Sequence, residues 1–100
     1  MKIAVVGCGY WGKNLIRNFS ELGVLAAVCD ADTNLAQERS ASYHVPALSF
    51  SDVLGDISIQ GVVIAAPAAQ HFDLAQRSLL AGKHVFVEKP LAFQSFLNSR

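Results

Sequence analysis

The sequence lacks any excess of charge of one sign. Its 100 residues hold eight Lys and Arg against eight Asp and Glu, so the formal net charge at pH 7 is zero. Binding to a polyanion needs a basic patch or stripe, and the sequence has no run of basic residues. We therefore expect no nucleic-acid partner.

Long apolar runs are also missing. The longest one, GVVIAAPAA, is far shorter than the roughly 20 residues that a helix needs to span a bilayer. The N-terminal stretch MKIAVVG leads into glycines rather than into a signal-peptide cleavage site. We therefore expect a cytoplasmic protein with no membrane partner.

Cysteine is scarce. The two cysteines, Cys8 and Cys29, match no metal-binding spacing, and we predict no metal site. Each follows a predicted strand, so the two thiols could lie close together at neighbouring strand tips. A reducing compartment disfavours a disulfide there, and we interpret both residues as small apolar core residues.

The sequence does contain an alternation of short apolar runs with longer helical patterns. Strands are predicted at 2–6, 25–30, 46–50, 61–66 and 84–88, and helices at 11–22, 32–43 and 70–81, with a short helical turn after Ser51. The first strand is continuously apolar, which is typical of a strand buried on both faces. The alternation predicts an α/β fold of the Rossmann type, a doubly wound parallel sheet of about five strands.

The length allows one domain and not two. We assign residues 1–92 to a dinucleotide-binding domain, for the reasons that follow. Residues 93–100 form a tail that could begin one more helix. No second domain is predicted within these residues.

Glycines at positions 7, 9 and 12 give the pattern G-x-G-x-x-G between the first strand and the first helix. Gly7 permits a tight turn, Gly9 lacks a Cβ so that a pyrophosphate can approach the backbone, and Gly12 lets the helix pack closely. The free N–H groups of the first helical turn then face the phosphates. Tyr10 and Trp11 are further cofactor-binding candidates. Trp11 is expected in the core, and Tyr10 either over the cofactor or over the loop.

Asp30 ends the second predicted strand, about 20 residues after the glycine motif. A carboxylate at this point can accept hydrogen bonds from both hydroxyls of an adenosine ribose, and it would repel a 2′-phosphate. The pattern therefore favours NAD over NADP as the cofactor. Asp30 could instead cap the next helix, but Asp32 and Thr33 can already fill that role.

Small residues follow the fourth predicted strand. Ligands of an open parallel sheet gather at the carboxyl ends of its strands, and Ala65 and Ala66 leave room there for a flat ring. Pro67 stiffens the turn. His71 falls in the first turn of the next helix, where it could contact the nicotinamide half or the substrate, or simply lie on the surface.

An acid, a base and a proline end the fifth predicted strand at Glu88, Lys89 and Pro90. A lysine at a strand tip could act as a general acid or base. Partial desolvation near another positive group would lower its pKa. On the pattern alone, a solvated Lys–Glu pair is the competing interpretation.

Together these segments resemble the N-terminal domain of the glucose–fructose oxidoreductase, inositol dehydrogenase and rhizopine-catabolism family (Gfo/Idh/MocA). The matching pieces are VVGCGYWGKN, VCDAD, VVIAAPAAQH and AGKHVFVEKPLA, which cover Met1 to about Ala92. The E-K-P tripeptide is the most specific of them. The run GYWGKNLIRNF is similar to the branch that includes UDP-N-acetylglucosamine 3-dehydrogenases.

The resemblance implies a role for each motif. The three glycines hold the pyrophosphate of NAD, and Asp30 holds its adenosine ribose. Pro67 and His71 border the nicotinamide. Glu88 contacts the cofactor, and Lys89 assists proton transfer.

The resemblance also has limits. Family enzymes carry a second, α+β domain that supplies the sugar-binding surface, whereas this sequence continues after EKPLA only as FQSFLNSR. We therefore expect the NAD(H)-binding domain of a sugar or nucleotide-sugar dehydrogenase, truncated and inactive alone, which meets its sugar only if a second domain is supplied. A free-standing dinucleotide sensor and a decayed domain that binds nothing tightly are the alternatives. The bond between Lys89 and Pro90 is a candidate for a cis peptide, as is common in the family.

The last predicted strand would lie at an edge of the sheet. Val85, Phe86 and Val87 would then stand beside unpaired backbone groups. An apolar edge and an uncovered face favour association. We therefore expect a homodimer or a larger homo-oligomer.

Overall fold

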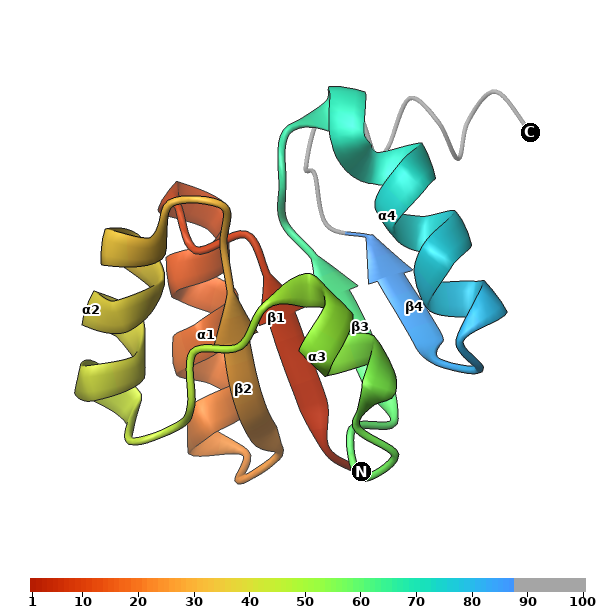
Figure 1. Cartoon of the computed structure of the whole chain (residues 1–100). Coiled ribbons are helices and arrows are strands. Elements are labelled where there is room, and N and C mark those ends of the chain that lie inside the picture. Colours follow the sequence, from red (N-terminus) through yellow and green to blue (C-terminus); the bar gives the residue numbers. More distant parts are fainter. Residues whose placement is uncertain (88–100) are drawn as a thin grey trace.

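Four parallel strands lie at the centre of the computed structural model, which describes residues 1–87 (Figure 1). The strands are β1 (Ile3–Val6), β2 (Leu25–Cys29), β3 (Gly61–Ile64) and β4 (His84–Val87). The helices are α1 (Tyr10–Glu21), α2 (Thr33–Tyr43), α3 (Phe50–Gly55) and α4 (Ala68–Leu80). The predicted Rossmann-type α/β fold is confirmed.

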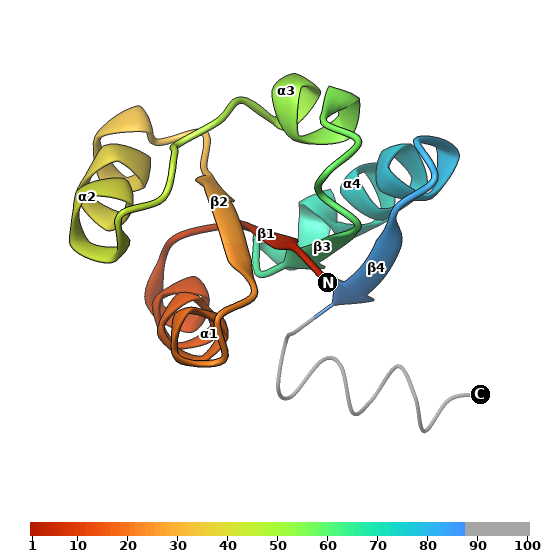
Figure 2. The ribbon, with the colours of Figure 1, turned by 90° about the horizontal axis from the view of Figure 1, so that it is seen from below.

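The strand order is β2-β1-β3-β4. After β1 the chain adds β2 on one side of it, and then crosses over to add β3 and β4 on the other side. Parallel strands joined through helices make right-handed crossovers. The two directions of travel therefore place α1 and α4 on opposite faces of the sheet, as Figure 2 shows. The gap between the carboxyl ends of β1 and β3 is the switch point at which such folds bind ligands.

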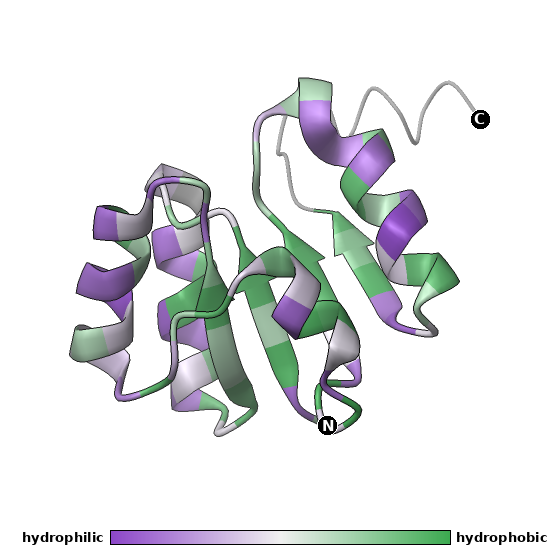
Figure 3. Cartoon of the chain, viewed as in Figure 1, coloured by the Kyte–Doolittle hydropathy of each residue, from purple (hydrophilic) through white to green (hydrophobic). Residues whose placement is uncertain are grey.

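Apolar side chains from both faces of the sheet form the core. All four residues of β1 and of β3 are buried, as the continuous apolar pattern predicted for the first strand. Figure 3 shows these hydrophobic strands beneath helices whose outer surfaces carry the polar residues. One group of side chains packs under α3 and α4 and the other under α1 and α2. The strands are therefore held by burial on both sides.

The prediction of a strand at 46–50 is wrong. The chain makes only an isolated bridge there, between Ala47 and Val28, before α3 begins. Pro46 has no N–H to donate to a ladder. Ser49, rather than the predicted Ser51, caps α3 by accepting a hydrogen bond from the Asp52 amide at 3.1 Å. This cap turns the segment into a helix after one bridging residue, and the described sheet has four strands instead of five.

The other element boundaries follow their local signals. Asp32 caps α2 by accepting from the Leu35 amide, as expected, and α4 begins two residues earlier than predicted, directly after Pro67. The strand β4 lies at an edge of the described sheet, and the side chain of Phe86 is 50% exposed. No helix among the described residues is long and apolar enough to cross a membrane.

The two cysteines are free thiols buried on opposite faces of the sheet. The Cys8 thiol donates a hydrogen bond to the Cys29 carbonyl at 3.5 Å. Burial, together with the negative charge of Asp30, raises the pKa of Cys8 to about 12 and that of Cys29 to about 11. Both residues are thus neutral core residues, which confirms the sequence interpretation.

Alkaline pH should destabilise the fold through Cys8. Its pKa is about 12 in the folded chain against an ordinary value of 9.0, so the stability from the neutral thiol is complete below pH 9 and is lost as the pH rises towards 12. In urea unfolding between about pH 8 and pH 11, the free energy of unfolding should fall more steeply for the parent than for Cys8→Ala, by up to about 1.4 kcal/mol per pH unit. Equal slopes would contradict this assignment.

Candidate functional site

The carboxyl ends of β1, β2 and β3 open into one cleft of about 1140 Å³. The cleft collects most of the residues predicted to bind a cofactor that belong to the described part of the chain. These lining residues are Gly7, Gly9, Tyr10, Asp30, Ala66 and Pro67. The sheet topology therefore brings the glycine turn, the acid after β2 and the small residues after β3 to one place.

Two of the three glycines are required by the packing of the protein itself. Gly7 has a φ of +103°, and a Cβ on it would lie 2.7 Å from the backbone of Ala65 and Ala66. A Cβ on Gly12 would lie 1.7 Å from the carbonyl oxygen of Gly7. The start of α1 thus rests directly on the turn, and the end of β3 closes against it.

Gly9 differs from the other two because nothing within 4 Å would meet a Cβ there. Its φ of −72° is negative, so the position does not require the left-handed conformation that favours glycine. Gly9 is also the cap residue of α1 and offers no side chain to the first amides of the helix, whose N–H groups lack helical partners. The open space over Gly9 leaves room for a pyrophosphate, and the free amides of the first helical turn can donate hydrogen bonds to it.

Asp30 links the end of β2 to the glycine turn. Its Oδ2 accepts a hydrogen bond from the Cys8 amide at 2.6 Å, and its Oδ1 accepts one from the Asp32 amide at 2.8 Å. Asp32 rather than Asp30 caps α2. The carboxylate therefore holds the turn and the start of α2 together at the edge of the cleft.

His71 is not among the residues that line the cleft. It lies in the first turn of α4, half-buried, and its Nε2 makes a hydrogen bond with the Ala66 carbonyl oxygen. This contact ties the helix to the segment that leaves β3. His71 thus contacts a lining residue, Ala66, without lining the cleft itself.

Apolar side chains that the sequence did not predict form one wall of the cleft. Leu48 and Phe50 come from the segment expected to form a strand, and Leu74 comes from α4. The guanidinium of Arg77 lies 4.8 Å from the centre of the Phe50 ring and covers it. The misassigned segment explains the omission, because no local pattern shows that α3 folds back over the sheet.

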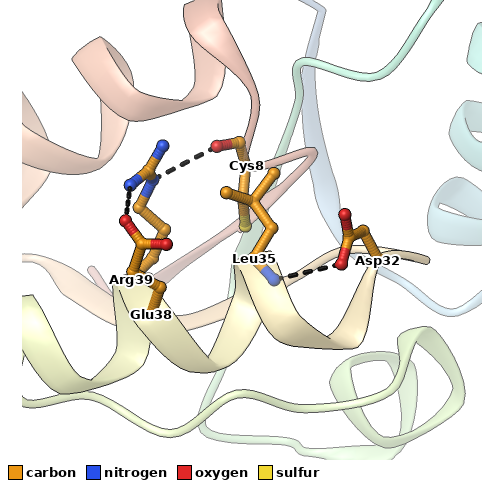
Figure 4. Close-up of polar contacts among 5 residues, drawn as sticks. All are labelled: Cys8, Asp32, Leu35, Glu38 and Arg39. Atoms are coloured by element: carbon orange, nitrogen blue, oxygen red, sulfur yellow. Dashed lines mark hydrogen bonds and ion pairs between the residues drawn. The ribbon is translucent and has the colours of Figure 1, made fainter.

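A second contact missed from the sequence joins α2 to the glycine turn. Figure 4 shows the Arg39 side chain between the Cys8 carbonyl and the Glu38 carboxylate. Arg39 Nε donates to the Cys8 carbonyl oxygen at 3.2 Å, and its Nη1 lies 3.2 Å from Glu38 Oε1. The turn is therefore held by α2 as well as by β2.

Several predicted features lie outside the described residues. They are Glu88, Lys89, the bond to Pro90, the tail 93–100 and the side chain of Trp11. Within residues 1–87, no three His, Cys, Asp or Glu side chains gather in a way that could hold a metal ion.

Comparison with known proteins identifies the family. The family model described as "Oxidoreductase family, NAD-binding Rossmann fold" (Gfo/Idh/MocA) matches residues 1–96. A glycosyl hydrolase family 109 protein of a Shewanella species is 30% identical over 105 residues, an alignment that covers 92% of this chain and 23% of the relative.

Solved structures agree with this assignment. UDP-N-acetylglucosamine 3-dehydrogenase from Acidithiobacillus ferrooxidans superposes with a TM-score of 0.83 at 30% identity, covering 90% of this chain and 28% of that one. Scyllo-inositol dehydrogenase from Lactobacillus casei, solved with NAD(H) and scyllo-inositol, gives 0.80 at 28% identity, with 90% and 28% covered.

The chain spans less than a third of the length of each of these relatives. The family that the sequence motifs predicted is confirmed. The chain belongs to the Gfo/Idh/MocA oxidoreductase family and represents its NAD-binding Rossmann domain.

Proposed function

We propose that the chain is the NAD(H)-binding part of an oxidoreductase that acts on a CH–OH group of a sugar, a nucleotide sugar or a cyclitol. The observation that carries this proposal is the shared cleft of Gly9, with open space over its backbone, and Asp30, with its carboxylate at the end of β2. The substrate class is supported by the names of two relatives, one for UDP-N-acetylglucosamine and one bound to scyllo-inositol.

The pyrophosphate would be held by backbone amides of the glycine turn and the first turn of α1, and the adenosine ribose by Asp30. A carboxylate has about four acceptor positions. The amides of Cys8 and Asp32 take two of those of Asp30, one on each oxygen. Each oxygen therefore keeps a lone pair for a ribose hydroxyl.

The nicotinamide would lie toward Ala66 and Pro67, with His71 behind them fixing the Ala66 carbonyl. Bound NAD supplies the hydride acceptor for oxidation of an alcohol. We further propose, from the family resemblance, that Glu88 contacts the cofactor and that Lys89 takes the proton of the hydroxyl that is oxidised.

We propose that these 100 residues bind the dinucleotide without turning over a sugar. Hydride transfer requires the alcohol carbon to be held against the nicotinamide in a reactive geometry. In this proposal the cleft provides the cofactor side of the site. The two structural relatives are more than three times as long as this chain. A second domain would supply the substrate contacts.

We also propose that the chain works in the cytoplasm as a homo-oligomer. Two free, buried thiols suit a reducing compartment. The edge strand β4 exposes half of the Phe86 side chain, and α4 beside it exposes Phe72 and Leu79. A second copy of the chain could cover this apolar edge.

The Asp30 carboxylate should set the choice of dinucleotide. In calorimetric titrations, the parent should bind NAD more tightly than NADP, and Asp30→Asn should weaken NAD binding about 10- to 100-fold, since hydrogen bonds to a charged group contribute about 1.5–3 kcal/mol. The same change should reduce the preference over NADP, because it removes the charge that repels a 2′-phosphate. Asp52→Asn, an exposed site on α3 outside the cleft, is the matched control. A parent that binds neither dinucleotide would overturn the proposal.

Sedimentation velocity should show a dimer or a larger species for the parent. Phe86→Lys places a charge on the edge strand and should shift the chain to the monomer. Leu22→Lys changes a still more exposed apolar residue directly after α1, 71% against 50%, and should leave the oligomer intact. A parent that stays monomeric at every concentration would refute the association.

A further inference from the structure

Arg39 in α2 reaches the glycine turn although it lies outside the motif. Its side chain is only 14% exposed, and its Nε donates to the Cys8 carbonyl oxygen at 3.2 Å (Figure 4). Its Nη1 also forms an ion pair with Glu38 on the same helix. Arg39 is not among the residues that line the cleft. Arg39 can therefore act on a bound ligand through the turn or through its charge, but not by lining the cleft.

The contact fixes one peptide group of the turn. Cys8 is held at both of its backbone polar groups, because Asp30 accepts from its N–H at 2.6 Å and Arg39 donates to its carbonyl. The bond between Cys8 and Gly9 is trans, so the Gly9 N–H points away from the Cys8 carbonyl. The hydrogen bond from Arg39 to that carbonyl oxygen therefore also orients the Gly9 N–H.

This orientation would be weakly determined without Arg39. Glycine restricts backbone rotation less than any other residue, and the peptide group in question lies beside Gly9. The Cβ position of Gly9 has open space around it, and the Gly9 carbonyl oxygen accepts a hydrogen bond from the Lys13 amide at 2.8 Å, which holds the next peptide group and not the one between Cys8 and Gly9. The buried Cys8 side chain and the Asp30 contact restrain the N-terminal side of this peptide group, and the hydrogen bond from Arg39 is the side-chain contact that restrains its carbonyl.

We propose that Arg39 is a positioning residue for the dinucleotide, which holds the Cys8–Gly9 peptide so that the Gly9 amide faces the cleft. The inference rests on the proposed function, because it assigns the amide to the pyrophosphate. Arg39 does not contact the cofactor. It acts by presenting a backbone donor in a fixed orientation.

Two substitutions separate the hydrogen bond from the charge. Arg39→Met keeps an unbranched side chain of similar shape and removes every donor. Arg39→Gln is neutral but carries an N–H at the place along the side chain where arginine has Nε. If the contact with the Cys8 carbonyl is what matters, Arg39→Met should lose NAD affinity about 10- to 100-fold, the range expected for a charge-assisted hydrogen bond. Arg39→Gln, whose neutral amide makes a weaker hydrogen bond, should then recover a clear part of the loss, about half on the free-energy scale.

The measurement pairs calorimetric titration of the 100-residue chain with ¹⁵N relaxation of the Gly9 amide in the absence of NAD. The order parameter of that amide should fall from about 0.85 in the parent toward about 0.6 in Arg39→Met. Thermal unfolding of each variant verifies that it is folded. Glu38→Gln, which removes only the ion pair, and Arg17→Met, which removes an exposed positive charge from α1, are the controls and should bind NAD like the parent.

Equal NAD affinity for Arg39→Met and the parent would overturn the inference. So would equal losses in Arg39→Met and Arg39→Gln, since charge would then be responsible. If the parent itself failed to bind NAD, the proposed function would fall. The relaxation data would still test whether Arg39 orders the turn, so the two failures are distinguishable.

Discussion

The hydrogen bond between the Asp30 carboxylate and the Cys8 amide is the interaction on which the site depends. It is 2.6 Å long and joins the end of β2 to the turn after β1. Because the other oxygen of Asp30 accepts from the Asp32 amide, the same carboxylate also sets where α2 begins. From α2, Arg39 reaches back to the carbonyl of Cys8. One acid thus ties the glycine turn to the residue that caps the next helix.

The glycine motif has two physical origins. Gly7 and Gly12 are needed for folding, since a Cβ on either would collide with backbone atoms of the protein. Gly9 has no such constraint, and its bare backbone faces the cleft. The motif thus contains glycines that packing requires, Gly7 and Gly12, and one that packing does not require, Gly9. The structure distinguishes these two kinds of glycine, whereas the spacing of the motif does not.

Much of the fold and part of the site could be predicted from the sequence because the signals are local. Apolar runs, helical periodicity and the glycine turn gave the order of β1, α1, β2, α2, β3, α4 and β4, and Asp30 followed from its place after β2. The strand at 46–50 failed because Pro46 and the Ser49 cap end it after one bridge. Arg39 and Phe50 were missed because their contacts arise only when α2 and α3 pack against the sheet.

The most direct test of the account is the affinity for NAD of Gly9→Val, measured by calorimetric titration beside Gly55→Val. Both glycines have open space where a Cβ would be, and neither needs a positive φ, so both variants should fold like the parent. Gly55 does not line the cleft. The account predicts that Gly9→Val binds NAD about 10- to 100-fold more weakly, through steric overlap with the pyrophosphate, while Gly55→Val binds normally. A folded Gly9→Val with the affinity of the parent would contradict it.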